Sequence, residues 1–356
     1  MRVKPSGFFF AAFAGLGVGL AAFGQTSGSS QITRTFNFAH TSGVQNINEI
    51  ATAIRTIVDT QPPVVDVASR SVTVRAAGDR MALAEWLFNG MDLASPVAAN
   101  SAIHEFRLAG SGDNIVRLFY LNRGQTVQEF QELATLVRTI GDVRRVYTTN
   151  EGKILALRGT ADQTAMADWL IPELEKSAGQ PRAHSVSSEY RLPTIAAPQP
   201  NENVMRVFYV GNAATIQSFQ EAATLIRTMT DIRRVYTSNA PRAVAVRGTA
   251  DQVALAAWLF DEIDKPAAGA LIPPSRVNHY QSSADADAVR VYYLPHIATV
   301  ADLQKTATQV RSEASIPRIY TYNAPRILAL RANADQIAHA DRLLKQLDPA
   351  DFPAAR

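Results

Sequence analysis

The residues with the clearest chemical potential in this 356-residue chain are arginines that recur in one setting. Each follows an apolar run and precedes a segment typical of a helix start: Arg158, Arg247 and Arg331. Free N–H groups and the helix dipole make a helix N-terminus favourable for anions. One interpretation is a carboxylate- or phosphate-binding position in each copy. We favour the alternative, an ion pair or backbone hydrogen bond that fixes the strand-to-helix corner, with Asp162, Asp251 and Asp335 as candidate partners.

A second set of cations lies on predicted strands. It consists of Arg144, Arg145, Arg233, Arg234 and Arg318. Because successive side chains of a strand point to opposite faces, only one arginine of each adjacent pair can face a given side. A basic ridge repeated along the chain would suit an acidic protein partner, so these five residues are our candidate partner-binding positions. The alternative is a solvated sheet face.

No set of residues indicates catalysis or metal binding. The six histidines are scattered, none pairs with another at helical i, i+4 spacing, and no H-E-x-x-H motif occurs. The absence of cysteine excludes disulfides, thiolate metal sites and cysteine nucleophiles. Gly-rich phosphate loops are missing as well. We therefore expect a protein that is not an enzyme, with no catalytic residue, no cofactor and no metal.

The N-terminus is typical of a secretory signal. Arg2 and Lys4 precede an apolar run from Phe8 to Phe23, and small residues near Gly24 offer a cleavage site, so residues 1–24 are the predicted signal peptide. The alternative is an uncleaved N-terminal anchor. Of 35 basic residues the signal holds two, which leaves 33 against 32 acidic ones, and this balance gives no bulk argument for nucleic acid or anionic lipid. We expect a periplasmic or otherwise exported protein.

One unit of sequence occurs four times. The run from Arg158 to Gln163 returns unchanged at 247–252 and in altered form at 331–336, and the first copy is degenerate but in register. Successive copies are 83, 89 and 84 residues apart, as from Arg75 to the three arginines above. Self-similarity at such a period indicates an array of structural units. The predicted modules are 33–94, 104–176, 188–265 and 278–348.

Each unit reads as β-α-β-β-α. In the second copy, two capping boxes, at Thr126 and Thr160, open predicted helices at 127–140 and 161–175, and apolar strands surround the first helix. Corresponding helices are predicted at 216–229, 250–264, 300–313 and 334–347. Short segments near 105–108, 189–192 and 279–281 are predicted extra edge strands. The predicted fold class is α+β: four tandem modules, each with a three- to four-stranded sheet and two helices on one face.

Tryptophans occupy one aligned helix position in three copies. They are Trp86, Trp169 and Trp258, and the fourth copy has Arg342 there. Tryptophan is enriched at interfaces, but we expect core packing on the apolar stripe of the helix. The side chains predicted to be buried are Phe130, Trp169, Leu170, Phe219, Trp258 and Leu259.

The order of elements resembles a known family. An apolar strand, a T-x-x-E helix start, a strand, a turn with Asn, an apolar strand and R-G-T-x-x-Q at a helix start resemble the periplasmic N-domains of bacterial secretins. The related short N-terminal modules of some TonB-dependent receptors are similar. The resemblance covers roughly residues 112–176, 201–265 and 286–348, and weakly 33–94. It does not include the β-rich channel domain of a secretin. The resemblance implies a ring-forming or docking protein without a pore of its own.

We therefore expect a non-enzymatic envelope protein that acts through protein–protein contacts, by docking or by ring assembly. The expected partners are envelope proteins of a secretion or outer-membrane complex and further copies of the chain, not nucleic acid or a small-molecule substrate. The alternative function is a repeat protein that binds peptidoglycan or polysaccharide. That function needs an exposed aromatic platform.

Overall fold

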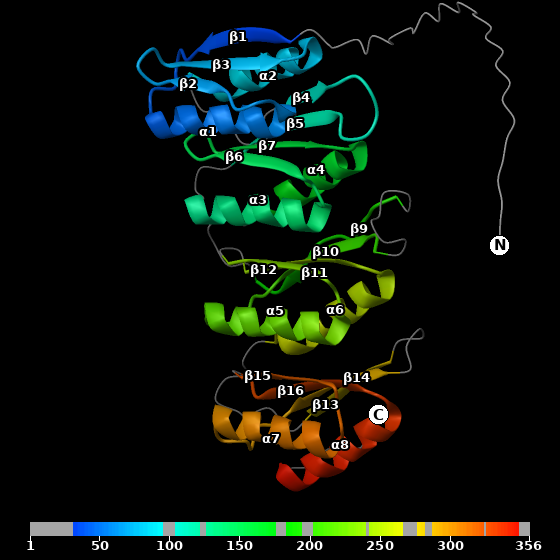
Figure 1. Ribbon diagram of the computed structural model, residues 1–356. Coiled ribbons are helices and arrows are strands. Elements are labelled where there is room, and N and C mark those ends of the chain that lie inside the picture. Colours follow the sequence, from blue (N-terminus) through cyan, green and yellow to red (C-terminus); the bar gives the residue numbers. More distant parts are fainter. Residues whose placement is uncertain are drawn as a thin grey trace, which may run out of the picture.

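The computed structural model is a stack of four modules (Figure 1). It describes residues 31–94, 104–121, 126–175, 183–193, 202–239, 242–265, 276–281, 287–323 and 325–348. The predicted signal peptide lies outside these residues. Within them, no helix has the length and apolar character needed to cross a membrane.

Module 2 shows how the unit is built. Its elements are β4 (His104–Arg107), β5 (Ile115–Tyr120), α3 (Val127–Gly141), β6 (Arg145–Thr149), β7 (Ile154–Gly159) and α4 (Ala161–Glu175). The sheet is antiparallel with strand order β4-β5-β7-β6. Thr126 and Glu129 form the predicted capping box at the start of α3, which satisfies two N–H groups that a helix end leaves free.

The other modules repeat this plan. Module 3 contains β8 (Ser185–Val186), β9 (Tyr190–Arg191), β10 (Val204–Tyr209), α5 (Ile216–Thr230), β11 (Arg234–Ser238), β12 (Ala243–Gly248) and α6 (Ala250–Ile263). Module 4 contains β13 (Arg276–Gln281), β14 (Ala288–Tyr293), α7 (Val300–Glu313), β15 (Arg318–Tyr322), β16 (Ile327–Ala332) and α8 (Ala334–Leu347). The predicted α+β class and the extra edge strands β4, β9 and β13 are confirmed, whereas the two-residue strand β8 was not predicted.

Module 1 is smaller. It contains β1 (Ile32–Asn37), α1 (Val44–Ile54), the π-helix η1 (Arg55–Asp59), β2 (Val64–Asp66), β3 (Ser71–Ala76) and α2 (Gly78–Met91). Its sheet has three strands in the order β1-β3-β2. The strand that precedes β5, β10 and β14 in the other sheets therefore has no counterpart among its described residues.

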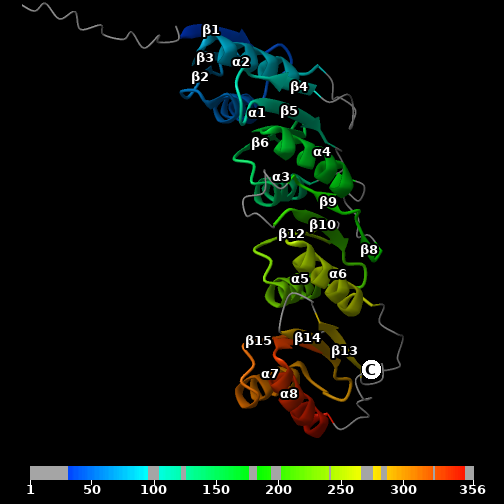
Figure 2. The same cartoon turned by 90° about the vertical axis from the view of Figure 1, so that its right-hand side faces the viewer.

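Helix layers and sheet layers alternate along the stack (Figures 1 and 2). The helices of one module pack on their own sheet and also on the far face of the next module's sheet. Phe130 and Leu170 of module 2, for example, share one hydrophobic core with Val207 and Tyr209 of module 3. The two helices lie on one face as predicted, but the opposite face of sheets 2–4 is buried by the preceding module, which the sequence analysis did not foresee.

The two ends of the stack carry polar residues at positions that are apolar in the internal junctions. On the outer face of the first sheet, Thr33 and Thr35 occupy the positions of Val116 and Leu118, which are buried at the first junction. At the other end, α7 carries Gln309 and Glu313 where α5 has the fully buried Leu225 and Met229. Terminal repeats with a polar outer face are what a stacked array needs for solubility.

A matched pair of substitutions tests this layering. Leu225→Ala should lower the free energy of unfolding by about 2–5 kcal/mol, because it opens a cavity under module 4. Gln309→Ala, at the aligned position of the last module, should change it by less than about 0.5 kcal/mol. Urea unfolding followed by circular dichroism measures both, and equal losses would contradict the layered arrangement.

Candidate functional site

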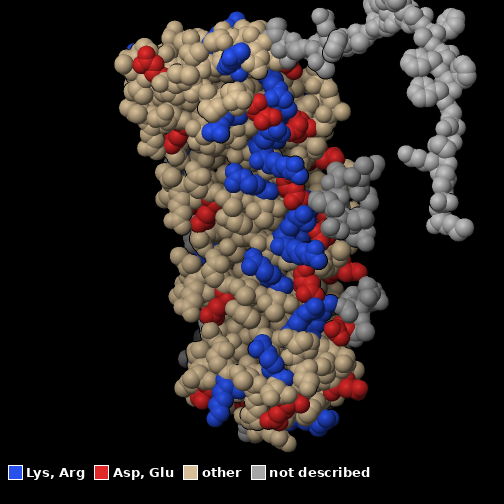
Figure 3. Space-filling view, viewed as in Figure 1, with Lys and Arg blue, Asp and Glu red and all other residues tan. Residues whose placement is uncertain are grey.

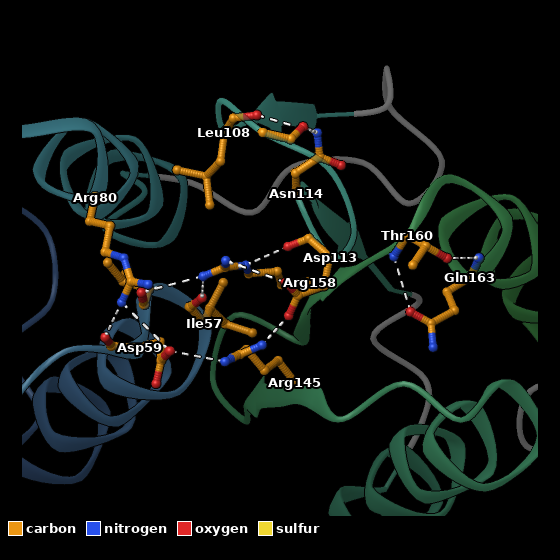
Figure 4. A network of polar contacts seen from close by, with 12 residues as sticks. Ile57, Asp59, Arg80, Leu108, Asp113, Asn114, Arg145, Arg158, Thr160 and Gln163 are labelled. Atoms are coloured by element: carbon orange, nitrogen blue, oxygen red, sulfur yellow. Dashed lines mark hydrogen bonds and ion pairs between the residues drawn. The ribbon is translucent and has the colours of Figure 1, made fainter.

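The junction between modules 1 and 2 is held by two arginines and the end of one helix (Figure 4). Arg158 Nη1 donates to the carbonyls of Ile57 at 3.3 Å and Val58 at 3.4 Å, in the last turn of η1. Arg145 Nη2 donates to a carboxylate oxygen of Asp59 at 2.9 Å. Arg145 also pairs with Asp113 of its own module.

The same arrangement recurs at the second junction. Arg247 Nη1 donates to Ile140 O at 2.9 Å and to Asp142 Oδ2 at 3.2 Å. Arg234 Nη2 lies 3.1 Å from that same carboxylate oxygen.

It recurs again at the third junction. Arg331 Nη1 donates to Met229 O at 2.8 Å and lies 3.4 Å from Asp231 Oδ2. Arg318 Nη1 lies 2.7 Å from the same oxygen. Each of the three junctions therefore joins two arginines of one module to one helix end of the module before it.

This arrangement solves an electrostatic problem inside each sheet. The two arginines of a junction are direct cross-strand partners: Arg145 with Arg158, Arg234 with Arg247, and Arg318 with Arg331. Like charges placed opposite one another are destabilising. The preceding module supplies the negative end of a helix dipole and a carboxylate, which together compensate both cations. Burial lowers the pKa of Arg158 and of Arg247, so these guanidinium groups depend on that compensation.

The carboxylate at each junction comes from a residue that ends a helix in a left-handed conformation. Asp59, Asp142 and Asp231 have φ values of 65°, 53° and 57°. Aspartate tolerates this region better than most residues. The left-handed turn closes the helix beside its own last carbonyls. Carboxylate and carbonyls therefore face the arginines together.

A second repeated contact joins a glutamate to an asparagine. The backbone N–H and the Nδ2 of Asn150 each donate to the carboxylate of Glu49 at 2.7 Å. Glu132 receives both donors of Asn239 at 2.9 Å, and Glu221 receives those of Asn323 at 3.1 and 2.8 Å. Two donors on one carboxylate fix the turn between two strands against the first helix of the preceding module.

The third repeated contact corrects the prediction for the tryptophans. Trp169 and Trp258 are half-buried, whereas Phe130, Leu170, Phe219 and Leu259 are fully buried as predicted. The tryptophans pack on an aromatic side chain of the next module's extra edge strand, with ring centroids 5.2–5.6 Å apart. The pairs are Trp86–Phe106, Trp169–Tyr190 and Trp258–Tyr280. Their task is to join modules as well as to fill a core.

The anion-binding interpretation finds no support in the groove beside Arg158. This groove, of about 1010 Å³, brings Arg158 near Thr160 and Gln163 at the start of α4. Thr160 and Gln163 are occupied by their own capping box, with N–H to oxygen distances of 3.0 and 3.3 Å. The structural interpretation of the arginine holds, but the proposed partner Asp162 was wrong. The partners are the preceding helix end and Asp113.

The five candidate partner-binding arginines fall into two groups. Arg145, Arg234 and Arg318 pair with carboxylates at the junctions described above. Arg144 and Arg233 are exposed. Across the visible face of the stack, basic and acidic side chains alternate in a column and form no continuous basic ridge (Figure 3). Strand alternation could separate the two members of each pair, but it could not show that one member faces a neighbouring module.

Comparison with solved structures returns the family that the sequence resembles. Aeromonas hydrophila ExeD is 14% identical, with 65% of this chain and 40% of that chain covered and a TM-score of 0.15. The N-terminal domain of the secretin XcpQ from Pseudomonas aeruginosa is 14% identical, with 66% and 100% covered and a TM-score of 0.19. The ETEC pilotin–secretin AspS–GspD complex is 11% identical, with 90% and 55% covered and a TM-score of 0.16.

The match thus spans less than two thirds of the ExeD and GspD chains. No protein-family model and no curated protein matches the chain. At these TM-scores the likeness carries no inference about function. Within the described residues, no group of three or more His, Asp or Glu side chains could hold a metal ion. The surfaces that stacking leaves open are the candidate functional features.

Substitution of a junction arginine tests the electrostatic account. Arg247→Ala should cost about 3–5 kcal/mol of stability, because it removes one partner of a buried charged contact and leaves Asp142 without its buried cation. Arg75→Ala is the matched control, since Arg75 holds the aligned position in module 1 and is exposed. We expect a change below about 0.5 kcal/mol there. Similar losses in urea unfolding would show that the junction adds nothing.

Proposed function

We propose that this chain is an exported, non-enzymatic docking protein of the cell envelope, which presents partner-binding surfaces on a rigid stack. The main observation that supports this proposal is the junction of three contacts that is repeated between modules. An arginine pair, a glutamate–asparagine contact and a tryptophan contact fix each module against the next. Such a stack holds the sides and edges of its modules at constant spacing, which suits binding to large partners rather than catalysis in a pocket.

The partners in this proposal are envelope proteins, such as those of a secretion or outer-membrane complex. Further copies of the chain are a second possibility, because modules of this kind could assemble side by side into a ring. Arg144 and Arg233 remain the proposed contact residues, since they are exposed. Arg145, Arg234 and Arg318 contribute to that surface only indirectly, through the stability of the junctions.

The polysaccharide-binding alternative has less support. It needs an open aromatic platform, and each tryptophan of the chain packs on an aromatic ring of the next module. Module 4 has Arg342 at the aligned position. The half-buried rings do not form a platform of the kind that stacks on sugar rings.

Capture of envelope proteins by the purified chain, read by mass spectrometry, tests the proposal. The double variant Arg144→Glu/Arg233→Glu should reduce capture about tenfold, because two exposed attractions become repulsions. Capture should also weaken as salt is added. The control Arg342→Glu/Lys345→Glu changes net charge equally on the exposed side of α8 and should leave capture unchanged. Equal capture by all variants would refute the role of these arginines, and sedimentation with peptidoglycan instead would favour the alternative.

A further inference from the structure

Among the described residues, the first strand of the stack, β1, is paired along one edge only. In modules 2–4 the strands equivalent to β1, namely β5, β10 and β14, are all central and pair with an extra strand. β1 pairs only with β3 among the described residues. Phe38 N donates to Arg70 O at 2.9 Å, and hydrogen bonding alternates along an antiparallel strand. The backbone N–H and C=O groups of Thr33 and Thr35 therefore point away from β3.

In modules 2–4, the edge strand at the far side of each sheet is protected in a way that β1 is not. On β6, β11 and β15, an arginine of the module's first helix donates to a strand carbonyl. These contacts are Arg138 to Val146 O at 3.0 Å, Arg227 to Val235 O at 2.8 Å and Arg311 to Ile319 O at 2.8 Å. Covering an edge in this way discourages pairing with another chain. β1 is six residues long, and its first four residues are exposed.

The edge of β1 also holds half of a charged clamp that is complete in module 2. There Arg117 pairs with Asp168 on α4, and its Nη2 lies 2.7 Å from Glu105 on the extra strand. Arg34 and Glu85 occupy the aligned positions in module 1 and pair with each other. The acidic strand residue has no counterpart among the described residues of module 1. The side chain of Arg34 is 48% exposed, against 14% for Arg117.

Module 3 repeats the acidic residue of module 2. Glu189, next to Tyr190 on β9, lies 3.8 Å from Arg206, the equivalent of Arg34. In modules 2 and 3 the extra strand carries the sequence Glu, aromatic residue, Arg, with the glutamate beside the arginine of the central strand, whereas in module 4 His279 lies opposite Arg290. Opposite charges on directly facing positions stabilise strand pairing.

We propose that β1 is a strand-addition site for an extended, acidic segment of another protein, whose carboxylate sits opposite Arg34. The backbone of Thr33 and Thr35 supplies the pairing groups, and Arg34 selects the acidic residue. A second copy of the chain fits less well, because antiparallel pairing of two β1 strands centred on Arg34 places like charges together. This inference rests on the docking function proposed above and identifies the chemistry of one partner.

A peptide with the sequence of residues 103–109, Ile-His-Glu-Phe-Arg-Leu-Ala, serves as the probe, since it carries the strand that completes module 2. Fluorescence anisotropy with the purified chain from Gln25 onward measures its binding. Arg34→Glu should weaken binding about tenfold, and a peptide with Arg in place of the glutamate should recover most of that loss. Arg75→Glu reverses a charge of the same module on the other face of the sheet and should have no effect.

Thr35→Pro tests the backbone pairing separately. It removes an N–H that points to the open edge and leaves the backbone bonds to β3 intact, as proline on an edge strand can do. Of the contacts with β3 it loses the hydrogen bond between the Thr35 and Thr73 hydroxyls. Binding should fall below detection while the circular dichroism spectrum is unchanged. Unchanged peptide binding by Thr35→Pro or by Arg34→Glu would overturn the proposal. A dimer of the chain that Thr35→Pro dissolves would also overturn it, because the occupant would then be a second copy.

These outcomes are independent of the capture experiment. Peptide binding with purified components, together with failed capture from the envelope, would leave the strand-addition site standing and remove the envelope docking function. Capture that depends on Arg144 and Arg233, together with no peptide binding, would do the reverse.

Discussion

The stack depends on one interaction, in which the end of a helix receives two arginines from the next module. Each arginine pair is unfavourable within its own sheet, because the two cations are cross-strand neighbours, and in modules 2 and 3 one cation, Arg158 or Arg247, is buried. Carboxylates of the same module, Asp113 beside Arg145 and Glu202 beside Arg234, compensate part of this charge, and the helix end of the preceding module supplies the rest. A module with such a pair is therefore incomplete alone, and its stability is coupled to that of its neighbour, as expected of stacked repeats.

The residues that form the junctions are offset by one copy along the sequence. The acidic positions Asp59, Glu49 and their equivalents occur in copies 1–3, and the last copy has Ser315 and Lys305 instead. The asparagines that pair with the glutamates occur in copies 2–4, and the first copy has Val67 at the aligned position. The tryptophans also occur in copies 1–3, and the last copy has Arg342 at the aligned position. In module 4 the acidic residues and the tryptophan are thus absent, and in module 1 the asparagine is absent although Arg75 remains at the position of Arg158. The outer faces of modules 1 and 4 therefore fit poorly against another module of this kind.

The elements of each module could be predicted from sequence because their signals are local. Capping boxes, apolar stripes and turn residues gave the helices and strands, and repetition gave the number of modules. The stacking could not be predicted from one module alone, because its contacts join residues about 100 positions apart, such as Glu132 and Asn239. Arg158 shows the consequence: its structural role was expected, but its partner was sought in its own module at Asp162. The true partners could have been inferred by noting which repeated residues are replaced in the first copy and which are replaced in the last copy.

Stacking also decides which surfaces remain for function. The faces of sheets 2–4 and the helices above them are used in junctions, so binding is restricted to the sides, the sheet edges and the two polar ends. Arginines cover the far edges of three sheets, and extra strands cover the near ones. β1 lies at the end of the stack, and no extra strand pairs with it within the part of the chain that the structure describes (Figure 1). A strand added there would extend the sheet of module 1 at its edge. It would disturb no junction, because the contacts to module 2 come from α1, η1 and α2, which cover one face of that sheet. The position can therefore bind a partner while the rest of the stack keeps its shape.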